Sequence, residues 1–329
     1  MKYSRATVGH MQLDDYVRVV PQIYGRHDQD RSIWDVWCHT LHHGAAVAER
    51  IRKNVPPEKL FTEIADFALW LFTVIQKLSG GLGSRKSSSE TPVESLIRVA
   101  NNCSDLVWYR YPGVCHVCHA RRTAGPAAQV DMANPCDCDW QLKDLRDKET
   151  KRSDSKALQE FGRANRKRKP KTIDDWQALF GHIFREKLRG LSKLEIGFHL
   201  LEELGEVSDA MVRMYSYTEG NFRRGEPNWR LARLEGQIAD VFSWLFALVE
   251  KLNDAEAVAP DGTRIRLSEI IWQRYGSERL RSFRCPVCNQ GVCTCRLVFV
   301  PATRPIQDLL RNFQPTRART KAQRKARKR

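Results

Sequence analysis

Residues 63–78, EIADFALWLFTVIQKL, have a close counterpart in residues 237–252, QIADVFSWLFALVEKL, with eight of the sixteen positions identical. Both segments are apolar on almost every face of a helix. In a chain without an apolar run of membrane-spanning length, such a helix is typical of the interior of a helical bundle. We therefore expect two equivalent buried helices, one in each half of the chain.

The similarity extends outward from this pair. Residues 13–53 align with residues 173–213 at a constant offset of 160, and SDLVWYRY at 104–111 aligns with SEIIWQRY at 268–275. Each copy then continues into a CxxC motif. Because the matches keep the same order in both halves, they indicate an internal duplication of one domain.

The pattern predicts an all-α fold. From Leu194 to Met211 apolar residues recur every three or four positions, and sustained alternation is rare in both copies. We expect two tandem helical repeats that pack as an intramolecular pseudo-dimer of four-helix-bundle type, each with a small zinc-binding appendage. The predicted boundaries are 1–140 for the first repeat, 141–171 for a charged basic linker, 172–298 for the second repeat and 299–329 for a basic tail.

Two short segments carry most of the net charge of +16. Residues 162–171 hold six basic residues and residues 316–329 hold eight, with no acidic residue in either. Without these fourteen charges the net charge falls to +2. Such segments are often only solvated, and these contain no aromatic residues to stack on bases, but salt-sensitive, non-specific attraction to nucleic acid is expected of them.

The chain has no run of 18 apolar residues and no signal-peptide pattern at its start. We therefore expect a soluble, cytoplasmic protein without a membrane partner. A homo-oligomer of the pseudo-dimer remains an open alternative.

Ten cysteines in an intracellular chain favour metal binding over disulfides. Eight form two CxxC and CxC groups, whose spacing suits a tetrahedral zinc ion. The two groups are Cys115, Cys118, Cys136 and Cys138, and Cys285, Cys288, Cys293 and Cys295. We predict two structural zinc ions per chain, with a redox or disulfide role as the alternative. Cys38 and Cys103 are expected to be buried small apolar residues.

Acidic residues interrupt both helices of the second copy. Glu202, Glu203 and Glu206 lie within little more than one helical turn, beside an apolar stripe. Asp240 lies in the otherwise apolar helix, where an uncompensated carboxylate costs several kcal/mol. A shared Mg²⁺ or Mn²⁺ ion would compensate these charges, because hard cations prefer oxygen ligands. An acidic surface patch is the alternative for the three glutamates.

The Glu-Glu-x-x-Glu motif followed by a helix with a closing aspartate resembles the MazG-type, all-α nucleoside triphosphate pyrophosphohydrolases, whose superfamily includes dCTP pyrophosphatases and dimeric dUTPases. The resemblance covers residues 173–252 well and residues 13–78 as a degenerate copy. It implies magnesium-dependent cleavage of a (d)NTP to the monophosphate and pyrophosphate. By position, the catalytic and metal-binding residues would be Glu202, Glu203, Glu206 and Asp240.

The second copy departs from the family pattern at one position. Gln237 stands where the remaining glutamate is expected, so it would ligate the metal only through its amide oxygen. Glu235 lies two residues away, on another side of the helix, and is a poor substitute. Lys251 is a candidate phosphate contact, with a solvated helix-end lysine as the alternative.

The first copy departs in the opposite way. Glu63 and Asp66 keep the Glu-x-x-Asp motif, but His42, His43 and Ala46 replace the three glutamates. Since Mg²⁺ does not favour imidazole, we expect no pyrophosphohydrolase centre there. These residues could be remnants, could hold a transition metal, or could join the Glu202 helix in a composite site.

Two functional hypotheses follow. The first is a magnesium-dependent nucleotide pyrophosphohydrolase with its active site in the second repeat, where metal ions activate a water and one glutamate orients it. The second is a catalytically inactive nucleotide-binding or scaffolding protein that engages nucleic acid or a partner through its basic segments. Gln237 and the His42–His43 replacement favour the second hypothesis.

Overall fold

The computed structural model describes residues 3–28, 31–78, 103–115, 158, 160–216, 229–253 and 264–295. Helices make up most of this part of the chain, and two strands of two residues each are the regular β-structure within it, so the predicted all-α class is confirmed. None of the helices described is long and apolar enough to cross a membrane.

The first half contains α1 (Arg5–Val8), α2 (Leu13–Asp28), α3 (Ile33–Arg52), α4 (Pro57–Leu78) and α6 (Cys103–Arg110). The second half contains α9 (Ile173–Ile183), α10 (Arg185–Gly190), α11 (Lys193–Ser216), α12 (Trp229–Lys251) and α13 (Leu267–Tyr275). A 3₁₀ helix, η3 (Arg166–Arg168), precedes α9. Strands β1 (Gly276–Ser277) and β2 (Ser282–Phe283) pair antiparallel after α13.

Local sequence explains where the long helices begin. At α3 the Asp35 N–H donates to Ser32 Oγ at 3.1 Å, and the Ser32 N–H donates to the Asp35 carboxylate at 2.9 Å. Ser192 and Glu195 make the same reciprocal pair before α11, at 2.7 and 3.2 Å. Each pair satisfies two backbone N–H groups that a helix start leaves without partners. The cap thus recurs at the offset of 160 found in the sequence.

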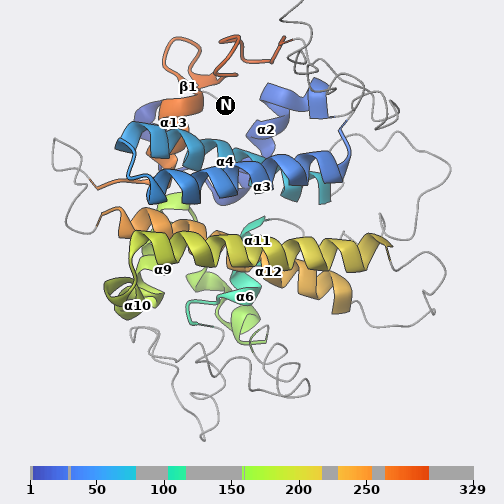
Figure 1. Ribbon diagram of the computed structural model, residues 1–329, viewed down its shortest axis with the longest axis vertical. Coiled ribbons are helices and arrows are strands. Elements are labelled where there is room, and N and C mark those ends of the chain that lie inside the picture. Colours follow the sequence, from blue (N-terminus) through green and yellow to red (C-terminus); the bar gives the residue numbers. More distant parts are fainter. Residues whose placement is uncertain are drawn as a thin grey trace, which may run out of the picture. The chain divides into compact units, whose positions relative to one another are not determined.

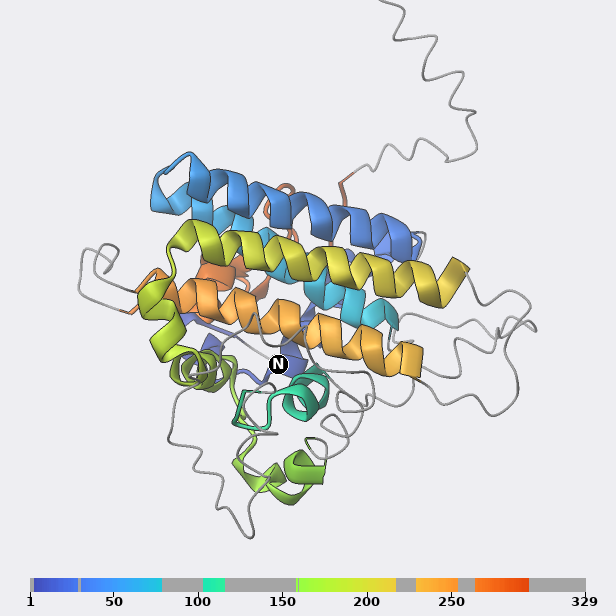
Figure 2. The same ribbon diagram turned by 60° about the horizontal axis from the view of Figure 1, so that its bottom comes forward.

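Four long helices surround the core. Helix α3 packs on α4, α11 packs on α12, and α3 and α11 contact each other, as Figures 1 and 2 show. Helices α4 and α12 supply fully buried aromatic rings, and the centroids of Phe72 and Phe242 lie 5.8 Å apart. The core therefore runs through both repeats. By its contacts, Met1–Cys293 is one compact unit, with Thr294–Arg329 as a second unit, and the predicted boundaries of the two repeats and the linker stay predictions.

Equivalent positions of the two repeats meet one another. An isolated antiparallel bridge joins Gln12 to Thr172, two positions separated by the offset of 160. Gly44 of α3 faces Leu204 of α11, a pair with the same separation. Contacts between equivalent positions are what a two-fold relation requires, so they support the pseudo-dimer interpretation.

His39 and His199 occupy equivalent positions in the two repeats, and both make the same aromatic contact. The His39 ring stacks on Trp70 with centroids 4.4 Å apart, and the His199 ring stacks on Trp244 at 4.5 Å. Since these pairs join α3 to α4 and α11 to α12, each repeat aligns its two long helices in the same way.

Gly44 provides a direct test of the packing between α3 and α11. A Cβ atom at this position would lie 2.3 Å from Leu204 Cδ1 and 3.3 Å from Phe67 Cε2, and both side chains are fully buried. We expect Gly44→Ala to lower the free energy of unfolding by about 1–3 kcal/mol, measured by urea denaturation. The control is Gly205→Ala, because a Cβ atom there has no neighbour within 4 Å. It should stabilise the helix by about 0.5–1 kcal/mol. Equal stability of wild type and Gly44→Ala would contradict the close packing.

Candidate functional site

Asp240 lies near the middle of α12 and is 1% exposed. Its carboxylate accepts two hydrogen bonds from Arg110, from Nε at 3.0 Å and from Nη2 at 2.8 Å. The Tyr111 hydroxyl donates a third at 2.7 Å. Arg110 thus supplies the positive charge that the sequence argument assigned to a divalent cation. Arg110 comes from the other half of the chain, 130 positions from Asp240.

Burial and the charge of Asp240 determine the protonation states of Arg110 and Tyr111. Burial lowers the pKa of Arg110, but the charge and hydrogen bonds of Asp240 outweigh it, and the pKa is raised above its ordinary value. Burial and the Asp240 charge raise the pKa of the Tyr111 hydroxyl. The guanidinium therefore stays charged and the phenol stays protonated, so both remain donors to the carboxylate.

The first repeat contains the same arrangement. Asp66 of α4 accepts hydrogen bonds from Arg274 Nε at 2.9 Å and Nη2 at 3.1 Å, and from the Tyr275 hydroxyl at 2.5 Å. Each repeat thus sends an Arg-Tyr pair, at the end of α6 or α13, to the aspartate of the other repeat. We call the two sets the interlocks: Asp240 with Arg110 and Tyr111, and Asp66 with Arg274 and Tyr275.

Motif and spacing did not identify these arginines and tyrosines as site residues, although the Arg-Tyr pair recurs before the CxxC motif of each copy. The signal that could have identified the interlocks is the duplication itself, since both the aspartate and the Arg-Tyr pair occur in each copy.

The three glutamates of α11 differ in burial and in partners, and the charge of Glu203 helps to raise the pKa of Arg110 and of Tyr111. Glu202 is exposed and pairs with His199 Nδ1 at 3.2 Å, whereas Glu203 is 5% exposed. The Glu206 carboxylate accepts a hydrogen bond from the Gln237 side-chain amide. We searched the described residues for groups of three or more side chains whose metal-ligating atoms all lie within 4.8 Å of one another. These three glutamates belong to no such group. The predicted Mg²⁺ or Mn²⁺ site therefore stays a prediction.

Lys251 and Glu235 of α12 were also considered for the predicted site. Lys251 Nζ donates to the Leu188 carbonyl oxygen at 2.6 Å, which fastens the end of α12 to α10. This bond accounts for Lys251 without a phosphate. Glu235 is half-buried, and burial raises the pKa of its carboxyl to about 7. This shift brings the pKa of Glu235 close to neutral pH.

The histidine site of the first repeat is partly assembled. His43 Nδ1 lies 3.2 Å from Glu63 Oε2, and the ligand atoms of His43, Glu63 and Asp66 all lie within 4.8 Å of one another. His42 is not part of this group, and its ring packs edge to face against His43 at 5.1 Å. Arg50 also binds Glu63, at 3.2 Å, and Arg274 binds Asp66. Because arginines already compensate both acids, a transition metal here stays a prediction.

The hydrogen bonds of Glu63 and Asp66 bear on the composite site that was predicted between these residues and the Glu202 helix. Within the described ranges, the side-chain bonds of Glu63 and Asp66 go to His43, Arg50, Arg274 and Tyr275. None of these partners belongs to α11. The repeats do complete each other, but they do so through the interlocks and not through shared carboxylates.

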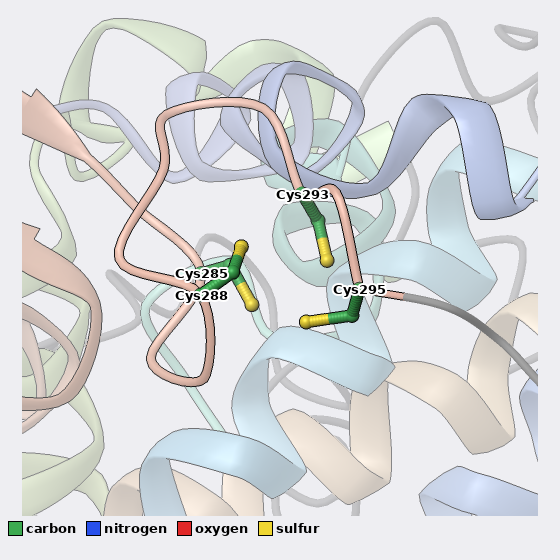
Figure 3. A group of neighbouring side chains, drawn as sticks. All are labelled: Cys285, Cys288, Cys293 and Cys295. Carbon is green, nitrogen blue, oxygen red and sulfur yellow. The ribbon is translucent and has the colours of Figure 1, made fainter.

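The second cysteine group forms a cluster that could bind a metal such as zinc. Cys285, Cys288, Cys293 and Cys295 point toward one another from a single loop (Figure 3), and their Sγ atoms all lie within 4.8 Å of one another. A tetrahedral zinc ion with four thiolates places the sulfur atoms about 3.8 Å apart, so only a small inward shift is required. We call residues 284–295 the cysteine loop.

Backbone bonds shape the cysteine loop and seat it on the first repeat. The Asn289 N–H donates to the Cys285 carbonyl oxygen at 2.9 Å, and Asn289 has the positive φ of 59° that closes this turn. The Cys293 N–H donates to the Ile23 carbonyl oxygen of α2 at 2.7 Å. The Tyr24 hydroxyl lies against Cys285, and burial followed by the Cys285 charge raises the pKa of Tyr24. The loop therefore has supporting contacts of the kind that orient metal ligands.

The remaining cysteines divide differently from expectation. Cys115 is buried, whereas Cys118, Cys136 and Cys138 lie outside the described residues, so the first predicted zinc site is not tested. Cys103 is buried as expected. Cys38 is exposed, which corrects the prediction that it is a buried apolar residue.

Comparison of the chain with protein-family models, with curated proteins and with solved structures finds no match.

Proposed function

We propose that the chain is a binding protein, a helical scaffold that engages nucleic acid or a similar polyanion and has no magnesium-dependent hydrolytic centre. One observation carries the proposal: Arg110 and Tyr111 occupy the carboxylate of Asp240, the residue on which the metal site depends. A magnesium ion would have to displace three hydrogen bonds from a buried carboxylate.

The basic segment before α9 supports the choice of ligand. Lys169 Nζ donates to Asp105 at 2.6 Å and Arg166 binds the same carboxylate at 3.3 Å, so two of its cations fasten the segment to α6. Lys167, Arg168 and Lys171 are exposed. Exposed cations on an anchored segment neutralise phosphates with release of counterions, which favours salt-sensitive binding of polyanions.

Zinc has a structural role in this proposal. A four-thiolate site has no open coordination position, so it contributes to folding and not to catalysis. We propose about two zinc ions per chain, one in each cysteine group, and a reducing compartment such as the cytoplasm, where thiolates persist.

Binding of a fluorescent double-stranded DNA or single-stranded RNA oligonucleotide, measured by anisotropy over a range of salt concentrations, tests this function. We expect the triple variant Lys167→Gln, Arg168→Gln, Lys171→Gln to weaken binding and to reduce the slope of log K against log salt by about 2–3. The charge-matched control is Arg52→Gln, Lys59→Gln, Arg279→Gln, which removes exposed cations elsewhere. Equal losses in both triple variants would contradict a localised binding segment.

The pyrophosphohydrolase remains a second candidate because of Glu235. A carboxyl with a pKa of about 7 suits a general base, and it adjoins Gly236, where an added Cβ would lie 3.9 Å from Arg110 Cζ. In this function Mg²⁺ or Mn²⁺ would bind Glu202, Glu203, Glu206 and Asp240, with the Gln237 amide oxygen as an optional ligand, and Arg110 would be released to hold a substrate phosphate.

Pyrophosphate release separates the two candidates. With Mg²⁺ or Mn²⁺ and a panel of NTPs and dNTPs, the binding protein should release no more pyrophosphate than a blank without protein. Release by the wild type that is lost in Glu203→Gln and in Asp240→Asn, with the fold of both variants verified by circular dichroism, would establish the hydrolase and overturn the first proposal.

A further inference from the structure

A pocket of about 330 Å³ lies where α4 and α13 meet the cysteine loop. This volume is at the lower end of the range of small-molecule sites in proteins. The pocket is separate from the Asp240 interlock and from the basic segment at 162–171. The pocket is lined by charged, polar and apolar side chains, among them Glu58, Phe61, Thr62, Arg274, Arg284 and Pro286.

Two guanidinium groups reach this pocket, and bonds to the protein hold both in place. Arg274 uses Nε and Nη2 for Asp66, and Arg284 uses Nε for the Gly276 carbonyl oxygen at 3.1 Å and Nη1 for the Asn289 side chain. These four bonds do not involve Nη1 of Arg274 or Nη2 of Arg284. Arginines that are already oriented lose little freedom when they bind an anion.

The other residues that line the pocket indicate which chemical groups the bound anion has besides its negative charge. Phe61 and Pro286 offer apolar surface, against which a ring or sugar can pack. Glu58 is the one acidic residue among those that line the pocket, and it repels a second negative charge but can accept a hydrogen bond from a hydroxyl or amino group. We propose that this pocket binds a small phosphorylated molecule of about mononucleotide size, with its phosphate on Arg274 and Arg284.

The metal cluster contributes to the same site. Arg284 and Pro286 flank Cys285 in the sequence, so a metal ion on the four thiolates fixes the position of this wall. The site therefore depends on the cysteine loop and not on α11 or the Asp240 interlock.

Calorimetric titration of the full-length, zinc-loaded protein with AMP, inorganic phosphate and adenosine tests the pocket. We expect saturable binding of AMP, weaker binding of phosphate, and none of adenosine. Arg284→Ala should weaken AMP binding about tenfold, since it removes a charge-assisted hydrogen bond. Glu58→Gln should strengthen it several-fold, because it removes a like charge. The control Arg279→Ala changes an exposed residue of the adjacent turn and should leave the affinity unchanged.

Opposite effects of Arg284→Ala and Glu58→Gln identify the pocket, because a general loss of structure would weaken binding in both. Circular dichroism and zinc content verify each variant. Failure to bind AMP or phosphate, equal binding of adenosine, or binding that neither substitution alters would overturn the proposal. None of these outcomes depends on Lys167, Arg168 and Lys171, so failure here is distinct from failure of polyanion binding.

Discussion

Replacing Arg110 by methionine is expected to lower the free energy of unfolding by about 3–5 kcal/mol, because it leaves the carboxylate of Asp240 buried without a counter-charge. Methionine keeps much of the apolar volume of the arginine stem, so the loss reports mainly on charge. Urea denaturation at pH 7, followed by circular dichroism, measures it. The deficit should shrink as the pH is lowered, since protonation of Asp240 removes the buried charge.

Two companion variants make this result specific. Adding Asp240→Asn to Arg110→Met should recover a large part of the loss, because the double variant no longer buries a charge. Arg274→Met at the other interlock should cost less, since the side chain of Asp66 is 12% exposed and that of Asp240 is 1% exposed. An unchanged stability of Arg110→Met, or a double variant no better than the single, would contradict the role of this ion pair.

Removing the metal is expected to have the second large effect. The cysteine loop carries Arg284, whose N–H donates to the Tyr275 carbonyl oxygen at 2.7 Å, and it rests on α2 through Cys293. Loss of zinc should therefore loosen both the loop and the Asp66 interlock. We expect a strong chelator to lower the melting temperature by about 10 °C or more, as structural zinc contributes its binding energy to folding.

Serine substitutions distinguish this effect from general thiol chemistry. Cys288→Ser removes one ligand of the cluster and should reproduce the chelator result with a lower zinc content. Cys38→Ser changes an exposed thiol outside the cluster and should affect neither quantity. Protein that contains no zinc, or that melts at the same temperature with and without chelator, would contradict a structural metal.

The sequence was sufficient for the elements that depend on local pattern. The two apolar segments at 63–78 and 237–252 became the buried parts of α4 and α12, and the apolar stripe from Leu194 became α11. The four cysteines at 285–295 met as their spacing indicated, because one short loop carries all of them. In each case the decisive residues lie close together in the chain.

The surroundings of the candidate acidic residues could not be predicted from spacing alone. Consecutive positions on a helix differ by about 100°, so Glu203 turns inward while Glu202 stays in solvent. The partner of Asp240 lies 130 positions away in the chain, beyond the reach of periodicity or motif spacing. Only the duplication links them, since a reciprocal contact between repeats requires the Arg-Tyr pair and the aspartate to recur together.

Titration of Mn²⁺ into the zinc-loaded protein, followed by electron paramagnetic resonance, tests most directly whether an arginine or a divalent cation compensates Asp240. The interlock predicts no Mn²⁺ site that depends on this carboxylate, so wild type, Glu203→Gln and Asp240→Asn should bind the ion equally weakly. One tightly bound Mn²⁺ per chain in the wild type, lost in both variants, would contradict it.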